Sequence, residues 1–220
     1  MKFDAILFDF DGVLIESEAV GDRQIAEYLT GIGHPTTAAD SFANFMGLSG
    51  SAFIAALERW IGRTLPEDFH TARRAEDERV MRAGIDAVEG AVRFVRGLPA
   101  DLPKAIASSS STAWIARHLD HIGLRDIFGA HLYSGKEHVV NGKPAPDVYL
   151  HAAAELGVDI ARCVIIEDSP VGAIGAVASG AYVVGFVGGT HCGPDHADKL
   201  RTIGVDAIAR DFGELWPLLD

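Results

Sequence analysis

Ala5-Ile6-Leu7-Phe8-Asp9-Phe10-Asp11-Gly12 is the stretch of this 220-residue chain that decides its fold. Its first four residues form a short apolar run, which is typical of a strand buried on both faces of a parallel sheet. Two acids and a glycine follow at once, so we expect a functional loop at the carboxyl end of the strand. Because residues two apart in a strand point the same way, Asp9 and Asp11 would repel each other unless a cation lies between them or one of them is protonated.

Four later apolar runs indicate that this strand has parallel neighbours, because helical patterns separate them. Strands that alternate with helices predict an α/β fold, here a Rossmann-like parallel sheet covered by helices on both faces. The apolar runs are 104–107, 131–133, 163–166 and 182–186, and the helical patterns are 90–97, 112–122, 146–156 and 171–180.

The stretch between the first strand and the first of these helices breaks the alternation. It contains no convincing strand, and apolar and charged residues have helical spacing at 23–29, 51–61 and 69–81. The sequence therefore predicts a small all-helical domain of residues 16–85, inserted directly after the first strand. The core domain is then discontinuous and consists of residues 1–15 and 86–220, with hinges near 13–17 and 85–89.

Polar side chains follow the predicted strands where each strand ends. In open parallel sheets, ligands bind at the carboxyl ends of the strands, so we expect these side chains to form one site. They are Asp9 and Asp11, then Ser108 and Ser109, then Ser134 with Lys143 beyond it, and finally Glu167 and Asp168.

Several carboxylates in one place predict a hard divalent cation, because such cations prefer oxygen ligands, and Mg²⁺ is the expected ion. Phosphoryl transfer uses a cation of this kind together with an in-line nucleophile and a proton donor. Asp9 can be the nucleophile and form an aspartyl-phosphate, and Asp11 can protonate the leaving alcohol. Taken alone, the Asp9 and Asp11 segment is equally typical of a solvated turn.

The other strand ends provide groups suited to a phosphate. Lys143 lies in the stiff turn Gly142-Lys143-Pro144-Ala145-Pro146 and would offset charge on the phosphate oxygens. Ser108 precedes a predicted helix and suits a phosphate oxygen, with Ser109 and Gly12 as further candidate phosphate contacts. The alternative for the serine run 108–111 is an ordinary cluster of helix-capping residues.

Composition narrows the possible partners. The net charge of -12 weighs against nucleic acids, which require a basic surface. No apolar run approaches the roughly 18 residues that span a membrane, and the N-terminus does not resemble a signal peptide, so we expect no membrane partner and a cytoplasmic protein. The two cysteines, Cys163 and Cys192, indicate neither a disulfide framework nor a zinc site. The expected partner is a small phosphorylated metabolite, bound by a monomer or weak dimer.

These motifs resemble those of the haloacid dehalogenase superfamily, in the group similar to β-phosphoglucomutase and sugar-phosphate phosphatases. The four signatures are Asp9-Phe10-Asp11-Gly12-Val13, Ser108, Lys143 and Glu167-Asp168-Ser169, and the helical insertion resembles the cap domain of that family. The resemblance implies magnesium bound by Asp9, the carbonyl of Asp11, and Asp168, with Glu167 contributing directly or through water. Because Asp11 is present, the resemblance favours ester phosphoryl transfer over carbon–halogen or carbon–phosphorus cleavage.

Phosphatases and phosphomutases of this family differ in whether water or a second substrate hydroxyl accepts the phosphoryl group. The mutases carry a histidine, a lysine and an arginine in the cap, where this chain has Gly21, Met46 and Gly50. Hydrolysis of a sugar phosphate or sugar-acid phosphate is therefore the favoured reaction. A phosphomutase is the alternative, and a non-catalytic binding protein on the same fold is a more remote one.

Less distinctive residues complete the sequence-based predictions. Glu18, Gly47 and Ser49 in the cap are candidate substrate contacts. His191 and His196 lie in a loop that could reach the site, for which a structural role is favoured. Five isolated histidines are expected at the surface or on helix faces: His34, His70, His118, His121 and His138.

Overall fold

The computed structural model describes residues 1–45, 48 and 50–220. The chain forms two compact units: Met1–Glu16 together with Ile85–Asp220, and Ser17–Gly84. We call the first the core unit and the second the helical unit. Their bounds lie within one residue of the ranges expected from the sequence.

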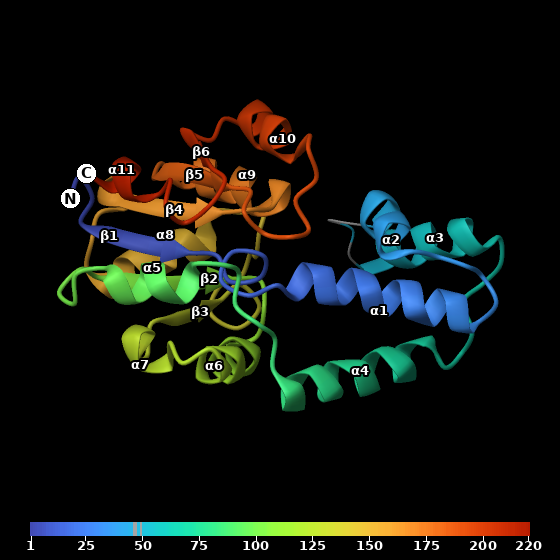
Figure 1. The fold of residues 1–220 in the computed structure, drawn as a ribbon. Helices are drawn as coiled ribbons and strands as arrows, with labels where there is room; N and C mark the ends of the chain where they lie inside the picture. The colour runs from blue at the N-terminus through green and yellow to red at the C-terminus, as the bar shows by residue number, and fades with distance from the viewer. Residues whose placement is uncertain (46–47, 49) are drawn as a thin grey trace. The chain divides into compact units, whose positions relative to one another are not determined.

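The core unit is built on one six-stranded sheet with the order β3-β2-β1-β4-β5-β6, in which every neighbouring pair is parallel. The first strand, β1, is central and pairs with β2 and β4 (Figure 1). The predicted parallel α/β fold is confirmed. The strands are β1 (Ala5–Phe8), β2 (Lys104–Ser108), β3 (Leu132–Ser134), β4 (Cys163–Glu167), β5 (Tyr182–Phe186) and β6 (Ala207–Ala209). The three-residue β6 at the sheet edge was not predicted.

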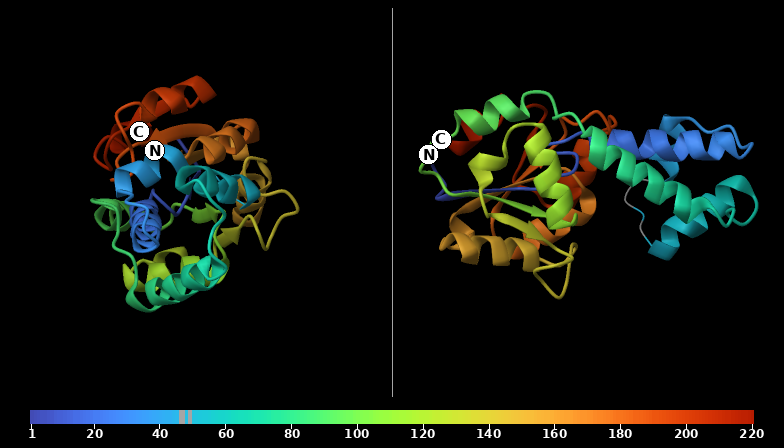
Figure 2. Two further views of the ribbon diagram at one scale, coloured as in Figure 1. Left: turned by 90° about the vertical axis from the view of Figure 1, so that its right-hand side faces the viewer. Right: turned by 90° about the horizontal axis from the view of Figure 1, so that it is seen from below.

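Helices lie on both faces of this sheet (Figure 2). Successive residues of β1 point to opposite faces, and both faces are covered. Leu7 packs on the side of α8 and α9, whereas the ring of Phe8 meets Phe94 of α5 and Phe128 of α7. The helical segments of the core unit are α5 (Ala91–Gly97), α6 (Thr112–His121), α7 (Arg125–Phe128), α8 (Asp147–Leu156), the 3-10 turn η1 (Ile160–Arg162), α9 (Pro170–Ser179), α10 (His196–Ile203) and α11 (Trp216–Leu219).

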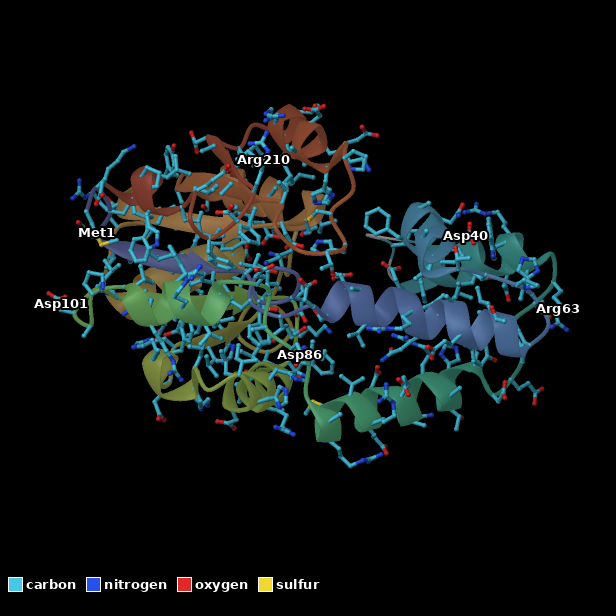
Figure 3. The ribbon with its side chains drawn as sticks, in the orientation of Figure 1. Met1, Asp40, Arg63, Asp86, Asp101 and Arg210 are labelled. Atoms are coloured by element: carbon cyan, nitrogen blue, oxygen red, sulfur yellow. The ribbon has the colours of Figure 1, made fainter. Side chains whose placement is uncertain are left out.

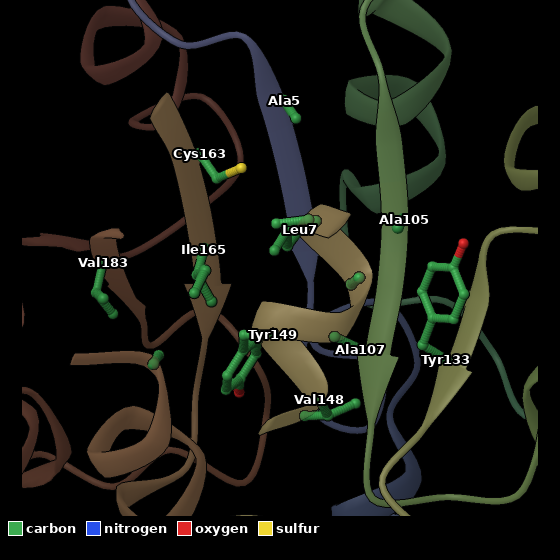
Figure 4. Close-up of a cluster of buried hydrophobic side chains, with 13 residues drawn as sticks. Ala5, Leu7, Ala105, Ala107, Tyr133, Val148, Tyr149, Cys163, Ile165 and Val183 are labelled. Carbon is green, nitrogen blue, oxygen red and sulfur yellow. The ribbon is translucent and has the colours of Figure 1, made fainter. Parts of the chain in front are cut away.

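The core on the α8 side explains why the strands have continuous apolar sequences. Small residues of β2, Ala105 and Ala107, leave room for Val148 and Tyr149 of α8 (Figure 4). Cys163 of β4 belongs to the same cluster and is fully buried. Tyr149 is the largest fully buried side chain among the residues that the structure describes, and its hydroxyl extends from this core toward the site described below.

The helical unit contains α1 (Ser17–Gly31), α2 (Ala38–Phe45), α3 (Gly50–Ile61) and α4 (Phe69–Ala83). Apolar side chains from these helices form a separate core that includes Leu29, Phe45 and Leu57. At the start of α2, Thr37 and Asp40 cap each other through reciprocal side chain–backbone hydrogen bonds (Asp40 is labelled in Figure 3). No helix in the described ranges is both long and apolar enough to cross a membrane.

Candidate active site

The candidate site lies where β1, β2 and β4 end. Asp9 directly follows β1, Ser108 is the last residue of β2, and Glu167 and Asp168 end and follow β4. Because the three strands are adjacent and parallel, their carboxyl ends share one edge of the sheet. All four side chains are buried. The site therefore collects polar groups from segments more than 150 residues apart in the sequence.

Lys143 is the cation of this site. Its Nζ lies 2.5 Å from Oδ1 of Asp9 and 2.8 Å from Oε2 of Glu167, and its side chain is only 4% exposed. It also lies over the ring of Tyr149, 4.9 Å from the centroid. The hydroxyl of Tyr149 donates to the same Glu167 oxygen at 2.6 Å. A buried lysine that contacts two carboxylates holds them in position and favours their ionised form.

The turn that carries Lys143 packs against α9 through a glycine. A Cβ on Gly175 would lie 2.8 Å from the carbonyl oxygen of Ala145 and 3.0 Å from that of Pro144. One turn earlier, a Cβ on Gly172 would lie 2.2 Å from Oε1 of Glu167. The two glycines let α9 approach both Glu167 and the Lys143 turn, so helix packing and site geometry depend on each other.

Burial and charge shift the acid–base properties of these groups. Burial and the charge of Glu167 raise the pKa of Asp9 well above its usual range, against the opposing effect of Lys143. Burial and the charge of Glu167 likewise raise the pKa of Asp168. Burial by itself lowers the pKa of Lys143, but the charges of Asp9 and Glu167 outweigh it and raise that pKa well above its usual range. The negative charge of the three carboxylates thus exceeds the positive charge that Lys143 supplies.

A divalent cation fits this excess of negative charge. Oxygens of Asp9, Glu167 and Asp168 lie within 4.8 Å of one another. Oδ1 of Asp168 is buried and has no hydrogen-bond partner among the described residues, which is costly unless a cation binds it. Both oxygens of Glu167, in contrast, already accept hydrogen bonds from protein groups. A hard cation with oxygen ligands matches this donor set.

Asp11 has different partners from Asp9. Its carboxylate accepts hydrogen bonds from Ser110 Oγ at 2.6 Å, Trp114 Nε1 at 3.0 Å and Ser108 Oγ at 3.3 Å. It lies beyond the end of β1 at Phe8, next to the turn at Gly12, where φ is +80°. Trp114, which sequence reasoning missed, has no motif around it that would distinguish it from other half-buried residues of α6.

Asp168 is held by two histidines, His191 from the loop before α10 and His196, the first residue of α10. His191 Nε2 lies 2.7 Å from Oδ2 of Asp168, and His196 Nε2 lies 2.6 Å from its backbone carbonyl oxygen. The contact is close-packed, since a Cβ on Gly12 would meet Oδ2 of Asp168 at 2.2 Å and Cε1 of His191 at 2.8 Å. The loop therefore reaches the site, and His191 contacts a carboxylate of the cluster.

The serine run at the end of β2 divides into separate roles. Ser108 is 1% exposed, and its Oγ accepts from the backbone N–H of Ser110. Ser109 is exposed. Ser111 is the residue that caps α6, with its side chain accepting from the N–H of Trp114. The capping alternative thus applies to Ser111, while Ser108 lies beside Asp11 in the site.

The helical unit carries the remaining residues that the sequence analysis singled out. Glu18 is exposed in the first turn of α1. Gly21 lies in the same helix, and a Cβ added there would have no atom outside the local helix within 4 Å. Gly47 and Ser49, together with Met46, lie outside the described residues.

Comparison with known proteins agrees with the motifs. Residues 3–180 match the haloacid dehalogenase-like hydrolases. The 6-phosphogluconate phosphatase of Escherichia coli is 25% identical over 216 residues, which cover 98% of this chain and 95% of that protein. The fructose-1-phosphate phosphatase YqaB of Escherichia coli is 30% identical and covers 83% of this chain and 96% of its own length.

A solved structure has the same fold throughout. A haloacid dehalogenase family hydrolase from Deinococcus radiodurans, crystallised with bound phosphate and sodium, superposes with a TM-score of 0.88 at 33% identity. The match covers 99% of this chain and 95% of that one. The fold is therefore shared along nearly the whole chain.

Proposed function

This chain belongs to the haloacid dehalogenase-like hydrolase family, and we propose that it hydrolyses a small sugar phosphate or sugar-acid phosphate through a phosphorylated Asp9. The predicted enzyme class, a phosphoric monoester hydrolase, is confirmed by the family match and by relatives that are phosphatases. The proposal adds the residues that carry out the reaction, magnesium as the cofactor and the class of substrate. We also propose a cytoplasmic location.

The buried contact of Lys143 with Asp9 and Glu167 carries the proposal. A nucleophilic carboxylate must stay ionised although burial favours its neutral form. The ammonium group of Lys143 at 2.5 Å opposes protonation of Asp9 and fixes its orientation for in-line attack. When the phosphoryl group arrives, the same ammonium group offsets charge on its equatorial oxygens.

Asp9, Asp168 and the carbonyl of Asp11 would hold Mg²⁺, with Glu167 acting through water because its own oxygens already accept hydrogen bonds. Bound there, the ion would neutralise charge and fix the phosphate next to Asp9. The unpartnered Oδ1 of Asp168 supports this assignment.

Asp11 would protonate the leaving alcohol and then take a proton from water in the second step. Its present partners, Ser108 and Ser110, are hydroxyls that suit a phosphate oxygen equally well. We propose that Ser108 exchanges Asp11 for the substrate phosphate, with the backbone at Gly12 and Ser109 nearby. The helical unit would act as the cap that recognises the organic part of the substrate.

The substrate class rests on the relatives. One relative acts on 6-phosphogluconate, a sugar-acid phosphate, and another on fructose 1-phosphate, a ketose phosphate. Both are small polyols with a single phosphate, as expected from the sequence of this chain.

The test is phosphate release by the purified full chain with magnesium, across a panel of monophosphates. The panel contains 6-phosphogluconate, fructose 1-phosphate, β-glucose 1-phosphate and a nucleoside monophosphate. We expect release from the sugar or sugar-acid members, abolished by a chelator. Asp9→Asn should lower kcat by about 10³-fold or more, because it removes the nucleophile.

Three results would contradict the proposal. Full activity of Asp9→Asn would exclude Asp9 as nucleophile. Conversion of β-glucose 1-phosphate to an isomer without free phosphate would establish the mutase instead. No release from any member of the panel would favour a binding protein.

A further inference from the structure

Outside the carboxylate cluster, three metal-binding side chains come together in the segment His191-Cys192-Gly193-Pro194-Asp195-His196. A ring nitrogen of each histidine and the Sγ of Cys192 lie within 4.8 Å of one another. Sγ is 3.3 Å from Nε2 of His191, and the two imidazole rings are 5.9 Å apart between centroids. We call these three residues the His–Cys–His cluster.

The donor atoms of this cluster differ in kind from those of the carboxylates. One thiolate and two imidazoles suit a borderline-soft cation such as Zn²⁺, whereas Mg²⁺ prefers oxygen. In a tetrahedral zinc site, a sulfur and a nitrogen ligand are about 3.5 Å apart, given the usual bond lengths. The Sγ–Nε2 separation of 3.3 Å is already close to that value.

Burial of the cluster is also consistent with a metal site. His191 and His196 are 6% and 2% exposed, while Cys192 is half-buried and leaves a path for an ion. Nδ1 of His196 is buried and has no hydrogen-bond partner among the described residues. An imidazole nitrogen in that state is one that ligation by a metal would satisfy.

Occupation of the cluster would affect the carboxylate site through one shared atom. His191 Nε2 is the atom that lies near Sγ of Cys192 and also the atom that contacts Oδ2 of Asp168. A cation bound by Nε2 would remove the hydrogen bond to Asp168. The carboxylate would then lose the contact that orients it.

We propose that His191, Cys192 and His196 bind a borderline-soft divalent cation such as Zn²⁺, and that this cation inhibits the enzyme by withdrawing His191 from Asp168. Binding involves loss of the thiol proton of Cys192 to solvent and formation of metal–sulfur and metal–nitrogen bonds. The binding half of the proposal is independent of the proposed function, and the inhibition half rests on it.

Cobalt(II) tests the binding half, because it occupies zinc sites and has a near-ultraviolet charge-transfer band when a thiolate binds it. The metal-free full chain is titrated with cobalt in the presence of excess magnesium, which fills the carboxylate site. The wild type should show the thiolate band, saturating at one cobalt per chain. Cys192→Ser should lose the band.

Cys163→Ala is the matched control. Cys163 is fully buried in β4, and burial raises its thiol pKa to about 11, so it is a poor source of thiolate. This variant should keep the band with the wild-type saturation point. Circular dichroism checks that both variants fold. Absence of the band in the wild type, or its survival in Cys192→Ser, would overturn the proposed site.

Phosphate release under excess magnesium tests the inhibition half with zinc as the probe. Zinc should inhibit the wild type and Cys163→Ala, and should inhibit Cys192→Ser much less. Equal inhibition of all three proteins, relieved by more magnesium, would mean that zinc acts at the carboxylates and would overturn this half. The cobalt band does not depend on catalysis. The titration therefore tests the metal site even if the protein shows no phosphatase activity.

Discussion

His191 affects the proposed chemistry without touching a substrate, through its hydrogen bond to Oδ2 of Asp168. With one oxygen of Asp168 held in this way, the other is left for a cation. Groups that hydrogen-bond to metal ligands orient them, and their loss commonly costs metal affinity. His191 is therefore a positioning residue for the proposed magnesium site.

We expect His191→Ala to weaken magnesium binding about 10–100-fold, because Asp168 loses its orienting donor. His191→Gln keeps a nitrogen donor near the same place and should restore part of the affinity. Isothermal titration of the metal-free protein with magnesium measures both. Unchanged affinity together with a lower free energy of unfolding would show that His191 only stabilises the fold.

His118 makes stability depend on pH. It is fully buried against Trp114, although a surface or helix-face position was expected from the sequence. Burial lowers the pKa of His118 from 6.5 to about 4. The charge of Asp11 opposes this shift, whereas Arg117 and His121 add to it. Between these values the unfolded chain binds a proton that the folded chain does not, so stability falls as pH decreases.

The loss in the free energy of unfolding should begin below pH 6.5, reach about 3 kcal/mol near pH 4 and then level off. Urea unfolding of wild type and His118→Leu across this range measures it. Other groups titrate in both proteins, so the difference between the two isolates His118. Parallel pH profiles would mean that folding does not change the pKa of His118.

At the level of elements, α9 determines the geometry of the site because it can approach closely. Gly172 and Gly175 bring the helix against Glu167 and the Lys143 turn, where any side chain would clash. Glycine inside a helix ordinarily costs stability relative to alanine. Here that cost is offset by the placement of two charged groups from different segments.

Gly175→Ala should therefore destabilise the protein by about 1–3 kcal/mol, since its Cβ would meet backbone oxygens that cannot rotate away. It should also lower kcat by displacing Lys143. Gly21→Ala in α1 is the matched control, because that glycine is helical and has open space around it. It should stabilise by up to about 1 kcal/mol. Equal effects in a urea titration would refute the packing argument.

At the level of the whole molecule, the carboxylate cluster belongs to the core unit. Asp9 and Asp168 are far apart in sequence, so the cluster exists only when the sheet is formed. A ligand that binds only the folded state stabilises it by an amount that grows with the logarithm of its concentration. Magnesium binding is thus linked to folding of the core unit.

Magnesium at about 100 times its dissociation constant should stabilise the core unit by about 2.7 kcal/mol, and a chelator should reverse the effect. Asp168→Asn should abolish this shift. Without metal, the variant should be at least as stable as the wild type, because one of three crowded carboxylates is removed. Calorimetry with and without magnesium measures both. A full magnesium shift in Asp168→Asn would place the ion elsewhere.

Most of the core fold was predictable because its physical basis is local. Apolar runs of three to five residues and helical spacing between them identified five of the six strands and the main helices of the core unit. The edge strand β6, the short helix α7 and, in the helical unit, α2 were not predicted. Length alone does not explain these misses, because the equally short β3 and the seven-residue α5 were identified.

The sequence by itself determined that acids, a serine and a lysine would meet at the carboxyl edge of a parallel sheet, because strand order and chain direction bring those ends together. Tertiary structure alone decided which atoms face each other. Asp11 accepts a hydrogen bond from Trp114, and His191 contacts Asp168, and both contacts depend on how segments pack after the strands have ended. Periodicity describes regular elements, whereas the position of a loop is set by packing between segments distant in sequence.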